Sequence, residues 1–378
     1  ISQTMRVSDP ILRWTLSLCL LALGGCVTLE RERETTWVAP SPKVEEALPY
    51  AVSLHRFELP AEGSDLVGTV QVTRAEHEDT FVDLARRFNV GYEELVRSNP
   101  GVDPWLPGEG REIVLPTQHL LPNAPREGVV INLAAMRLYY FPKVAKGENP
   151  IVYTFPIGIG RVGWATPVGS TRITRVAKNP SWRPGPGVRR EHRENGEILP
   201  AVVPAGPDNP LGTRAMYLGW AGYLIHGTNK PAGVGLRSSH GCIRLFPEDV
   251  EFLYDLVGPG TKVTVVNQPF VFGWHEGQLL LQAFDVLEDD PRNWKTARQK
   301  LLTRALAARL EKRLKAQGES IDWAAVSRVS HEPRGVPLAV SRGIETFDTV
   351  VARATRVRNA LPIGANWHGE LAASEGTR

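Results

Sequence analysis

Ser238-Ser239-His240-Gly241-Cys242-Ile243-Arg244-Leu245 is a stretch in which a histidine stands two residues before a cysteine. A second histidine lies in the stretch before it, Tyr223-Leu224-Ile225-His226-Gly227-Thr228. A thiolate is a strong nucleophile when a nearby base takes its proton, and such a base lowers the pKa of the thiol. Tyr223 to Ile225 is a short apolar run, which predicts a buried strand with His226 at its end. Gly241 lets the backbone approach a substrate and direct N–H groups to one point, as an oxyanion hole requires. The two stretches predict a nucleophilic cysteine site.

A structural alternative exists for each residue taken singly. A lone cysteine is more often a small buried hydrophobe, and a lone histidine beside a strand is more often a core residue. The complete pattern favours chemistry. His226-Gly-Thr, a gap, and then Ser-His-Gly-Cys-Ile-Arg-Leu resembles the signature of the YkuD-type L,D-transpeptidases, the penicillin-insensitive enzymes of bacterial cell walls.

The resemblance implies a catalytic role for five positions. Cys242 matches the acyl-accepting nucleophile, and His226 matches the histidine that takes its proton. Gly227 falls where the family supplies a group, often a backbone carbonyl, that orients this imidazole. His240, Gly241 and the N–H of Cys242 are expected to line the oxyanion side of the site.

Three further positions are expected to bind substrate: Thr228, Ser239 and Arg244. Arg244 stands where many family members carry Asn, although a related subgroup has Arg. This departure leaves two roles open for Arg244, a clamp on a peptide carboxylate or support for the loop.

The reaction that the resemblance implies is acyl transfer on peptidoglycan stem peptides. Cys242 attacks the carbonyl of the third residue, D-alanine leaves, and the thioester passes to an amine of a second stem peptide or of a wall-attached lipoprotein. Such an enzyme serves cell wall organisation and cell shape. Because a thiolate, an imidazole and backbone donors suffice, no cofactor and no metal is expected. Two alternatives stay open: an L,D-carboxypeptidase or other hydrolase using the same site, and a non-catalytic wall-binding protein.

The composition predicts a multidomain globular protein. A length of 378 residues suggests two or three domains, and 42% hydrophobic with 22% charged residues is sufficient for a core. The net charge of +3 is too small to argue for a nucleic-acid partner. The sequence has no phosphate-loop motif and no paired-cysteine metal motif.

Residues 1–26 are expected to be a lipoprotein-type signal peptide. Two arginines precede the apolar run Trp14 to Leu23, which is too short to span a membrane. Leu23-Gly24-Gly25-Cys26 resembles a bacterial lipobox, which implies lipidation of Cys26; an ordinary signal peptide is the alternative. Residues 27–66, with four prolines, are expected to be a tether. The expected location is the periplasm, with a lipid anchor in a membrane, the outer one by preference.

Residues 67–116 are expected to form a small β-α-α-β domain. Val67 to Thr73 alternates like a strand, Phe81 to Phe88 has helical spacing, a second helix starts at Gly91, and Arg111 to Leu115 predicts the closing strand. The motifs resemble those of a LysM module, namely Asp79-Thr80-Phe81, Asn99-Pro100 and Ile113-Val114-Leu115-Pro116. The resemblance implies binding to N-acetylglucosamine-containing glycan strands of peptidoglycan. An unrelated helical hairpin is the alternative.

Residues 128–267 are expected to form a mostly β catalytic domain, sandwich- or barrel-like, because short strands alternate with Gly and Pro. The insert 179–212 contains seven prolines and predicts either an active-site lid or a plain surface loop.

Residues 268–378 are expected to be an α-rich C-terminal extension, partly disordered. Phe270 to Gly273 and Gln278 to Ala283 predict a hairpin, and Lys295 to Lys315 predicts an amphipathic helix. The basic face of this helix is either a solvated surface or a contact with anionic wall polymer or lipid. Disorder is expected past about Leu361.

Overall fold

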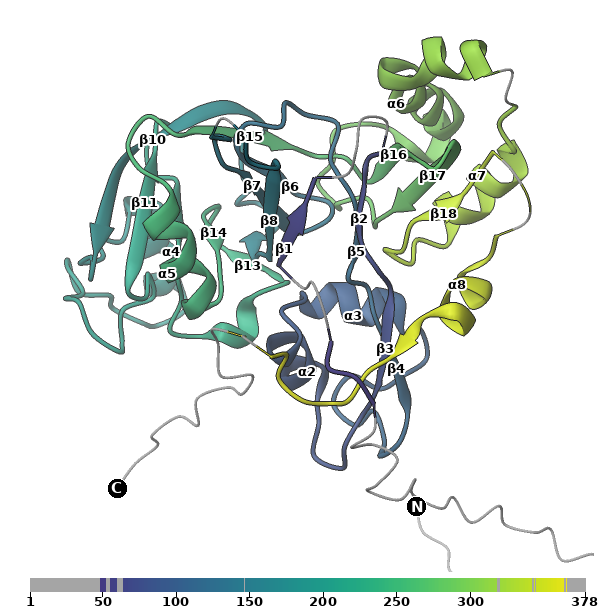
Figure 1. Ribbon diagram of the computed structural model, residues 1–378. Coiled ribbons are helices and arrows are strands. Elements are labelled where there is room, and N and C mark those ends of the chain that lie inside the picture. The colour runs from purple at the N-terminus through teal and green to yellow at the C-terminus, as the bar shows by residue number, and fades with distance from the viewer. Residues whose placement is uncertain are drawn as a thin grey trace, which may run out of the picture. The chain divides into compact units, whose positions relative to one another are not determined.

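The computed structural model describes residues 48–51, 55–59, 64–145, 147–317, 320–341, 343, 345–363 and 365 (Figure 1). The expected signal peptide, the lipidation site Cys26, most of the 27–66 stretch and the tail beyond residue 365 lie outside the described residues. Among the described helices, none is long and apolar enough to cross a membrane.

A nine-stranded mixed sheet forms the centre of the 128–267 region, in the order β1-β8-β7-β6-β15-β10-β11-β12-β14. The pairs β6/β15 and β12/β14 are parallel, and the other neighbours are antiparallel. The bounds are β1 Arg56–Glu58, β6 Gly128–Asn132, β7 Arg137–Phe141, β8 Ile151–Pro156, β10 Gly169–Lys178, β11 Arg214–Leu218, β12 Leu224–His226, β14 Ile243–Arg244 and β15 Lys262–Val266.

The core of this region lies against the sheet. Alternate strand residues such as Ile131, Ile225 and Ile243 are buried together with Val250 and Leu253 of helix α5 (Pro247–Leu256). A separate parallel pair joins β9 (Ile159–Gly160) to β13 (Arg237–Ser239), and the short 3-10 helix η1 spans Pro231–Gly233.

The prediction of a mostly β domain is confirmed. Nine strands form one mixed sheet, whereas the sequence suggested a sandwich- or barrel-like arrangement. The sequence did not reveal the two parallel pairs, because strand pairing depends on contacts distant in sequence. The insert 179–212, expected to lack regular structure, contains α4 (Pro186–Glu194).

Part of the stretch interpreted as a tether belongs to the fold. Strand β1 pairs with β8, and its Phe57 is buried. Further along, β2 (Leu66–Gly68) pairs with β5 (Gln118–Leu120). A strand of three residues is too short to show a clear alternating pattern, so the sequence did not indicate β1.

The elements of the 67–116 region follow one another as strand, helix, helix and strand: β3 Gln71–Arg74, α2 Phe81–Arg87, α3 Tyr92–Ser98 and β4 Glu112–Leu115. Thr80 caps α2 by accepting a hydrogen bond from the Asp83 N–H at 3.3 Å. The expected single strand from Val67 to Thr73 is divided at Gly68, whose φ of +75° favours glycine. A Cβ there would lie 2.1 Å from the carbonyl oxygen of Thr117.

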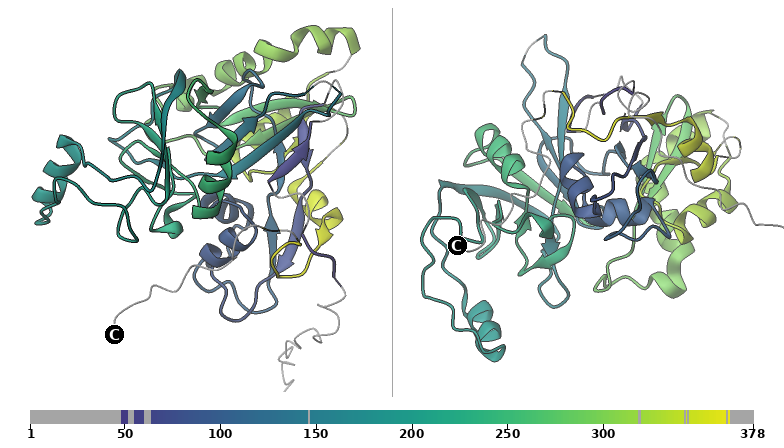
Figure 2. Two further views of the ribbon diagram at one scale, coloured as in Figure 1. Left: turned by 60° about the vertical axis from the view of Figure 1, so that its left-hand side comes forward. Right: turned by 90° about the horizontal axis from the view of Figure 1, so that it is seen from below.

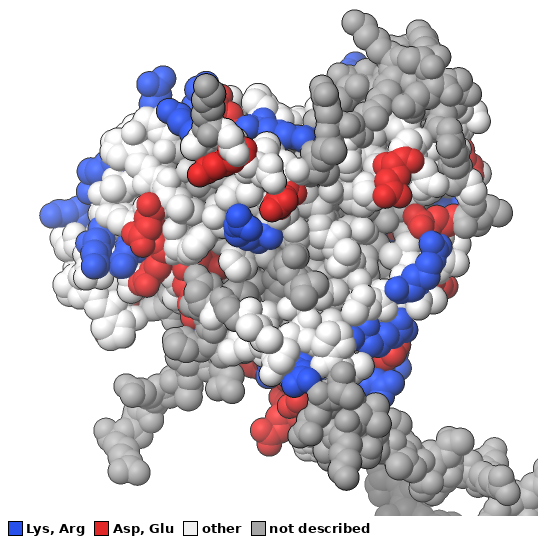
Figure 3. Space-filling view, viewed as in Figure 1, with Lys and Arg blue, Asp and Glu red and all other residues white. Residues whose placement is uncertain are grey.

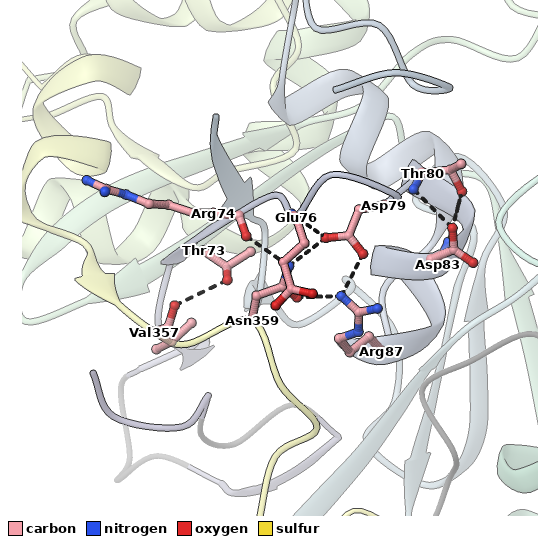
Figure 4. A network of polar contacts seen from close by, with 9 residues as sticks. All are labelled: Thr73, Arg74, Glu76, Asp79, Thr80, Asp83, Arg87, Val357 and Asn359. Atoms are coloured by element: carbon pink, nitrogen blue, oxygen red, sulfur yellow. Dashed lines mark hydrogen bonds and ion pairs between the residues drawn. The ribbon is translucent and has the colours of Figure 1, made fainter. Parts of the chain in front are cut away.

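The C-terminal part of the chain completes this sheet. Strand β19 (Thr355–Arg356) adds in parallel to β3, giving the order β19-β3-β4. The side chain of Asn359 donates to the carbonyl oxygen of Arg74 at 2.8 Å and to Asp79 at 2.6 Å, and accepts from Arg87 at 2.6 Å (Figure 4). The β-α-α-β unit therefore depends on residues that lie more than 200 positions later in the sequence.

The rest of the C-terminal region is mixed rather than purely helical. The predicted hairpin is present, and a third strand joins it. Leu302 and Leu306 of the predicted helix are buried against this sheet, whereas the side chains of Leu310 and Leu314 are not described. The bounds are β16 Phe270–His275, β17 Gln278–Ala283, α6 Trp294–Gln317, α7 Trp323–His331, β18 Leu338–Ala339 and α8 Phe347–Arg353.

Buried polar contacts join the β-α-α-β unit to the nine-stranded sheet and to α5. Arg137 of β7 makes a bidentate pair with Glu94 of α3, with N–O distances of 2.8 and 2.7 Å. Arg86 of α2 pairs with Glu248 of α5. Because the guanidinium of Arg137 is almost fully buried, loss of Glu94 would leave an uncompensated charge in the interior.

Charges on the surface are mixed in sign. On the described part of the face in Figure 3, Lys and Arg side chains are interspersed with Asp and Glu. This face therefore does not present one extended field of a single sign.

Candidate active site

Two neighbouring strands lie beside the expected nucleophile and the expected base. Strands β12 and β14 run parallel, with Ile225 opposite Ile243, and both isoleucines point into the core. Cys242 immediately precedes β14, and His226 is the last residue of β12, opposite Arg244. Extending the strand register by one residue places the Cα atoms of Cys242 and His226 about 8 Å apart.

His226 is held as a neutral imidazole with a defined tautomer. The side chain is 4% exposed, and its Nδ1 lies 2.6 Å from the carbonyl oxygen of Gly227. Because a carbonyl only accepts, Nδ1 carries the hydrogen and Nε2 keeps a lone pair. Burial and then the Arg244 cation lower the pKa of His226 to about 3. Nε2 is therefore unprotonated at neutral pH.

Cys242 rests as a thiol. Its Sγ donates to the carbonyl oxygen of Gly222 at 3.5 Å, and burial raises the pKa of the thiol above its ordinary value. A backbone hydrogen bond at Leu224 and the Arg244 cation act in the opposite direction but are smaller effects. The sequence predicted a lowered pKa from the nearby histidine. The structure differs, because the buried imidazole is neutral and supplies no positive charge to stabilise a thiolate.

Side-chain hydrogen bonds hold the turn that carries the sulfur. The Ser239 hydroxyl donates to the Cys242 carbonyl at 2.6 Å and accepts from the Gly241 N–H at 3.1 Å. Thr166 donates to the Gly241 carbonyl at 2.9 Å. Gly241 has a φ of +97°, and a Cβ there would lie 2.9 Å from the Tyr223 ring. The Gly241 N–H is thus engaged inside the turn, and the Cys242 N–H is the backbone donor next to the sulfur.

The three expected substrate-binding residues make internal contacts. Ser239 is 2% exposed and is used in the turn. Thr228 is buried and accepts from the Lys230 N–H at 2.9 Å. Arg244 donates to the Ser238 hydroxyl at 3.2 Å, which corresponds to the loop-support alternative, and its cation also lowers the pKa of His226.

His240 points into a polar cluster that sequence reasoning missed. Its Nε2 lies 3.2 Å from Arg161 Nη2 and 3.3 Å from Glu191 Oε2, and the Trp164 ring meets it edge-on at 4.8 Å between centroids. Burial lowers the pKa of His240; the Glu191 carboxylate raises it and Arg161 lowers it. We call Arg161, Trp164, Glu191 and His240 the Glu191 cluster. The signal available in the sequence was the Gly-rich turn around Arg161 and the charged run around Glu191.

Among the described residues, no group of three or more His, Cys, Asp or Glu side chains is placed to hold a metal ion. The chemistry that the site offers is that of a partly buried thiol and a neutral imidazole on adjacent chain segments.

Comparison with known proteins places the chain in a family. Residues 126–265 match YkuD, the L,D-transpeptidase catalytic domain. The chain is 41% identical to the probable L,D-transpeptidase YcfS of Escherichia coli (strain K12) over 256 residues, which is 65% of this chain and 79% of YcfS. It is 38% identical to the probable L,D-transpeptidase ErfK/SrfK of the same strain, over 76% of this chain and 91% of that protein. It is also 45% identical to the probable L,D-transpeptidase YbiS of this strain, over 56% of this chain and 69% of YbiS. With Cys242 and His226 both inside the matched region, the chain belongs to the YkuD family of L,D-transpeptidases.

Proposed function

We propose that the protein is a peptidoglycan L,D-transpeptidase in which Cys242 is the nucleophile and His226 is the general base. The observation that carries this proposal is the tautomer of His226. Its Nδ1–H donates to the Gly227 carbonyl at 2.6 Å, so the lone pair of the imidazole is on Nε2. A base of this kind, beside a thiol on a rigid sheet, suits attack on a carbonyl.

The first half-reaction forms a thioester. Sγ of Cys242 attacks the carbonyl carbon of the third stem residue while the thiol proton passes to Nε2 of His226. The carbonyl electron pair moves to oxygen, towards the Cys242 N–H. When the intermediate collapses, the C–N bond to D-alanine breaks and the imidazolium gives its proton to the leaving amine. The Gly227 carbonyl stabilises the imidazolium during this interval.

The second half-reaction releases the acyl group. An acceptor amine attacks the thioester and loses its proton to Nε2; the C–S bond breaks, and the sulfur recovers the proton. Water is far more concentrated than any stem amine, so transfer prevails only if the acceptor is bound and aligned, which corresponds to effective molarities of about 10⁵ M or more. The arms of the insert 179–212, joined at Trp182 and Val203, are the part of the chain proposed to exclude water and so to favour transfer over hydrolysis.

Product analysis tests the proposal. The protein is incubated with disaccharide-tetrapeptide, alone and with a free D-amino acid, and the products are resolved by mass. Cross-linked dimers or tetrapeptides with an exchanged last residue are expected, and Cys242→Ala is expected to abolish them without unfolding the protein. Tripeptide alone at every acceptor concentration would indicate an L,D-carboxypeptidase, and turnover by a folded Cys242→Ala variant would remove the nucleophile assignment.

A glycan-binding role for the 67–116 region is part of the proposal, in line with its resemblance to a LysM module. Trp105 is 67% exposed in the loop between α3 and β4, and Leu106 beside it is also exposed. This loop lies at the start of α2, since the Phe81 N–H donates to the Pro104 carbonyl at 2.8 Å. An exposed indole offers a flat apolar face on which a sugar ring stacks.

We also propose lipidation at Cys26, a periplasmic location with an outer-membrane anchor, and a stem peptide or a wall-attached lipoprotein as acceptor. The lipobox-like sequence before Cys26 motivates the anchor. Metabolic labelling with a fatty acid tests it: label retained in a Cys26→Ala variant would refute this part of the proposal.

A further inference from the structure

The carboxylate of Glu191 is surrounded by three side chains of the catalytic domain. Arg161 Nη2 pairs with Oε1, Trp164 Nε1 donates to Oε2 at 3.1 Å, and His240 Nε2 lies 3.3 Å from Oε2. A cation, an indole N–H and an imidazole converging on two carboxylate oxygens match the hydrogen-bonding pattern of a bound carboxylate ligand.

Glu191 reaches this position from the inserted helix α4 rather than from the sheet. Figure 2 shows α4 standing at the tip of two long arms of the insert. The arms are joined by mutual backbone hydrogen bonds of 2.8 Å between Trp182 and Val203. The helix is seated on the Trp164 ring, because a Cβ on Gly187 would lie 2.7 Å from it. These three side chains belong to segments other than α4.

The cluster is close to the reacting sulfur and accessible to solvent. His240 is two residues before Cys242, and Arg161 is tied to the same turn by its N–H, which donates to the Ser239 carbonyl at 3.1 Å. The side chains of Glu191 and His240 are 27% and 24% exposed. Hydrogen bonding from Arg161 lowers the pKa of Glu191, so its carboxylate is ionised at neutral pH. Partly exposed ion pairs of this kind are weak, so another carboxylate is able to displace Glu191.

We propose that Arg161, Trp164 and His240 form a subsite for a carboxylate of the substrate peptide, and that Glu191 occupies this subsite as an internal substitute when substrate is absent. The proposal rests on the proposed function, because stem peptides are the substrates that bring such carboxylates to Cys242. Binding of substrate then exchanges one carboxylate for another and releases α4 from the cluster.

Alkylation of Cys242 by two matched reagents tests the subsite without transpeptidation. N-bromoacetylglycine and N-bromoacetylglycinamide carry the same electrophile, and only the first has a carboxylate at its far end. The quantity measured is the ratio of their rate constants. Replacement of Glu191 by Gln is expected to raise this ratio by about threefold, the scale of a partly exposed ion pair. The double variant Glu191→Gln/Arg161→Gln is expected to return the ratio to the original value or below it.

The insert offers matched controls, because Glu194 and Arg190 are exposed on the same helix. Glu194→Gln and Arg190→Gln make the same charge changes outside the cluster and are expected to leave the ratio unchanged. An equal rise in Glu191→Gln and Glu194→Gln, or a rise that persists in the double variant, would overturn the subsite. Failure of both reagents to modify Cys242 in every variant would overturn the proposed nucleophile as well, so the two failures are distinguishable.

The same assay identifies which carboxylate is bound. A disaccharide-tetrapeptide is compared, as a protectant against N-bromoacetylglycinamide, with analogues amidated at the terminal residue or at the side chain of the diamino acid. Protection is expected to depend on Arg161, and one of the two amidations is expected to remove that dependence. Protection that is independent of Arg161 for all three peptides would overturn the proposal.

Discussion

At the scale of single residues, the neutral state of the two proposed catalytic groups has a consequence for the pH dependence. Burial raises the pKa of Cys242, and burial with the Arg244 cation lowers the pKa of His226 to about 3. Between pH 5 and 8 neither group changes its charge in the free protein. The proton is therefore transferred during attack rather than before it.

Alkylation of Cys242 by iodoacetamide is expected to rise with pH in one step that belongs to the thiol, without an inflection between pH 5 and 8. His226→Ala is expected to keep that profile while it lowers acyl transfer by roughly 10²–10⁴-fold, the usual size of general-base catalysis. His331→Ala, on the exposed side of α7, is the control. An inflection near pH 6 that disappears in His226→Ala would instead indicate a preformed thiolate–imidazolium pair.

At the scale of elements, helix α5 contacts the β-α-α-β unit through the buried carboxyl group of Asp249. Asp249 is buried, and its Oδ1 accepts from Asn89 Nδ2 at 2.8 Å, while its Oδ2 has no hydrogen-bond partner among the described residues. Burial, with a smaller repulsion from Glu248, raises the pKa of Asp249 to about 7. The contact between these elements is therefore sensitive to pH near neutrality.

Asp249→Asn is expected to flatten the dependence of stability on pH. Because the folded-state pKa is above the unfolded value, the folded protein holds the proton, and this stabilisation is lost as pH rises towards 7. Between pH 5 and 8 the wild type is expected to lose about 1–3 kcal/mol relative to Asp249→Asn, since one pKa unit corresponds to about 1.4 kcal/mol.

The difference between the two proteins is the quantity to measure, by calorimetry at pH 5 and pH 8. His226 acts in the opposite direction: its depressed pKa means that stability is lost as pH falls below its ordinary value of 6.5, and this contribution cancels in the comparison. Asp255→Asn, exposed on the same helix, is the control. Parallel pH profiles for wild type and Asp249→Asn would contradict the raised pKa.

At the scale of the whole molecule, the β-α-α-β unit is interleaved with the rest of the chain. Its sheet includes β19 from the C-terminal region, and its helices pair with β7 and α5 through Glu94 and Arg86. Removing the unit would expose the buried guanidinium of Arg137 and would leave the Asn359 side chain without its partners in that unit. A deletion therefore does not separate glycan binding from catalysis, whereas a point substitution does.

Trp105→Ala in the full chain is expected to weaken sedimentation with purified sacculi by roughly three- to tenfold, corresponding to about 0.5–1.5 kcal/mol for an aromatic contact. Turnover of soluble muropeptides is expected to stay the same, because Trp105 lies in an exposed loop outside the catalytic site. Val144→Ala, another exposed apolar residue, is the control. Undiminished binding by Trp105→Ala would remove this loop from the glycan-binding proposal.

The sequence by itself determined the nucleophilic motif, the family resemblance and most of the strands and helices. These features are local: a catalytic turn needs a fixed order of Ser, His, Gly and Cys, and amphipathic elements show their period within a few residues. For the same reason the hairpin of β16 and β17 was predictable, since its two strands are neighbours in sequence.

The tertiary structure alone decided which distant groups meet. Glu191 contacts His240, which lies about 50 positions later in the sequence. Asn359 contacts Asp79, which lies more than 200 positions earlier. Neither contact leaves a periodic signal, because each depends on how whole elements pack. The protonation states of Cys242 and His226 were also decided at this level. Desolvation depends on all the surrounding side chains. Its effect on the two pKa values is larger than that of the thiolate–imidazolium pair that the two neighbouring motifs suggest.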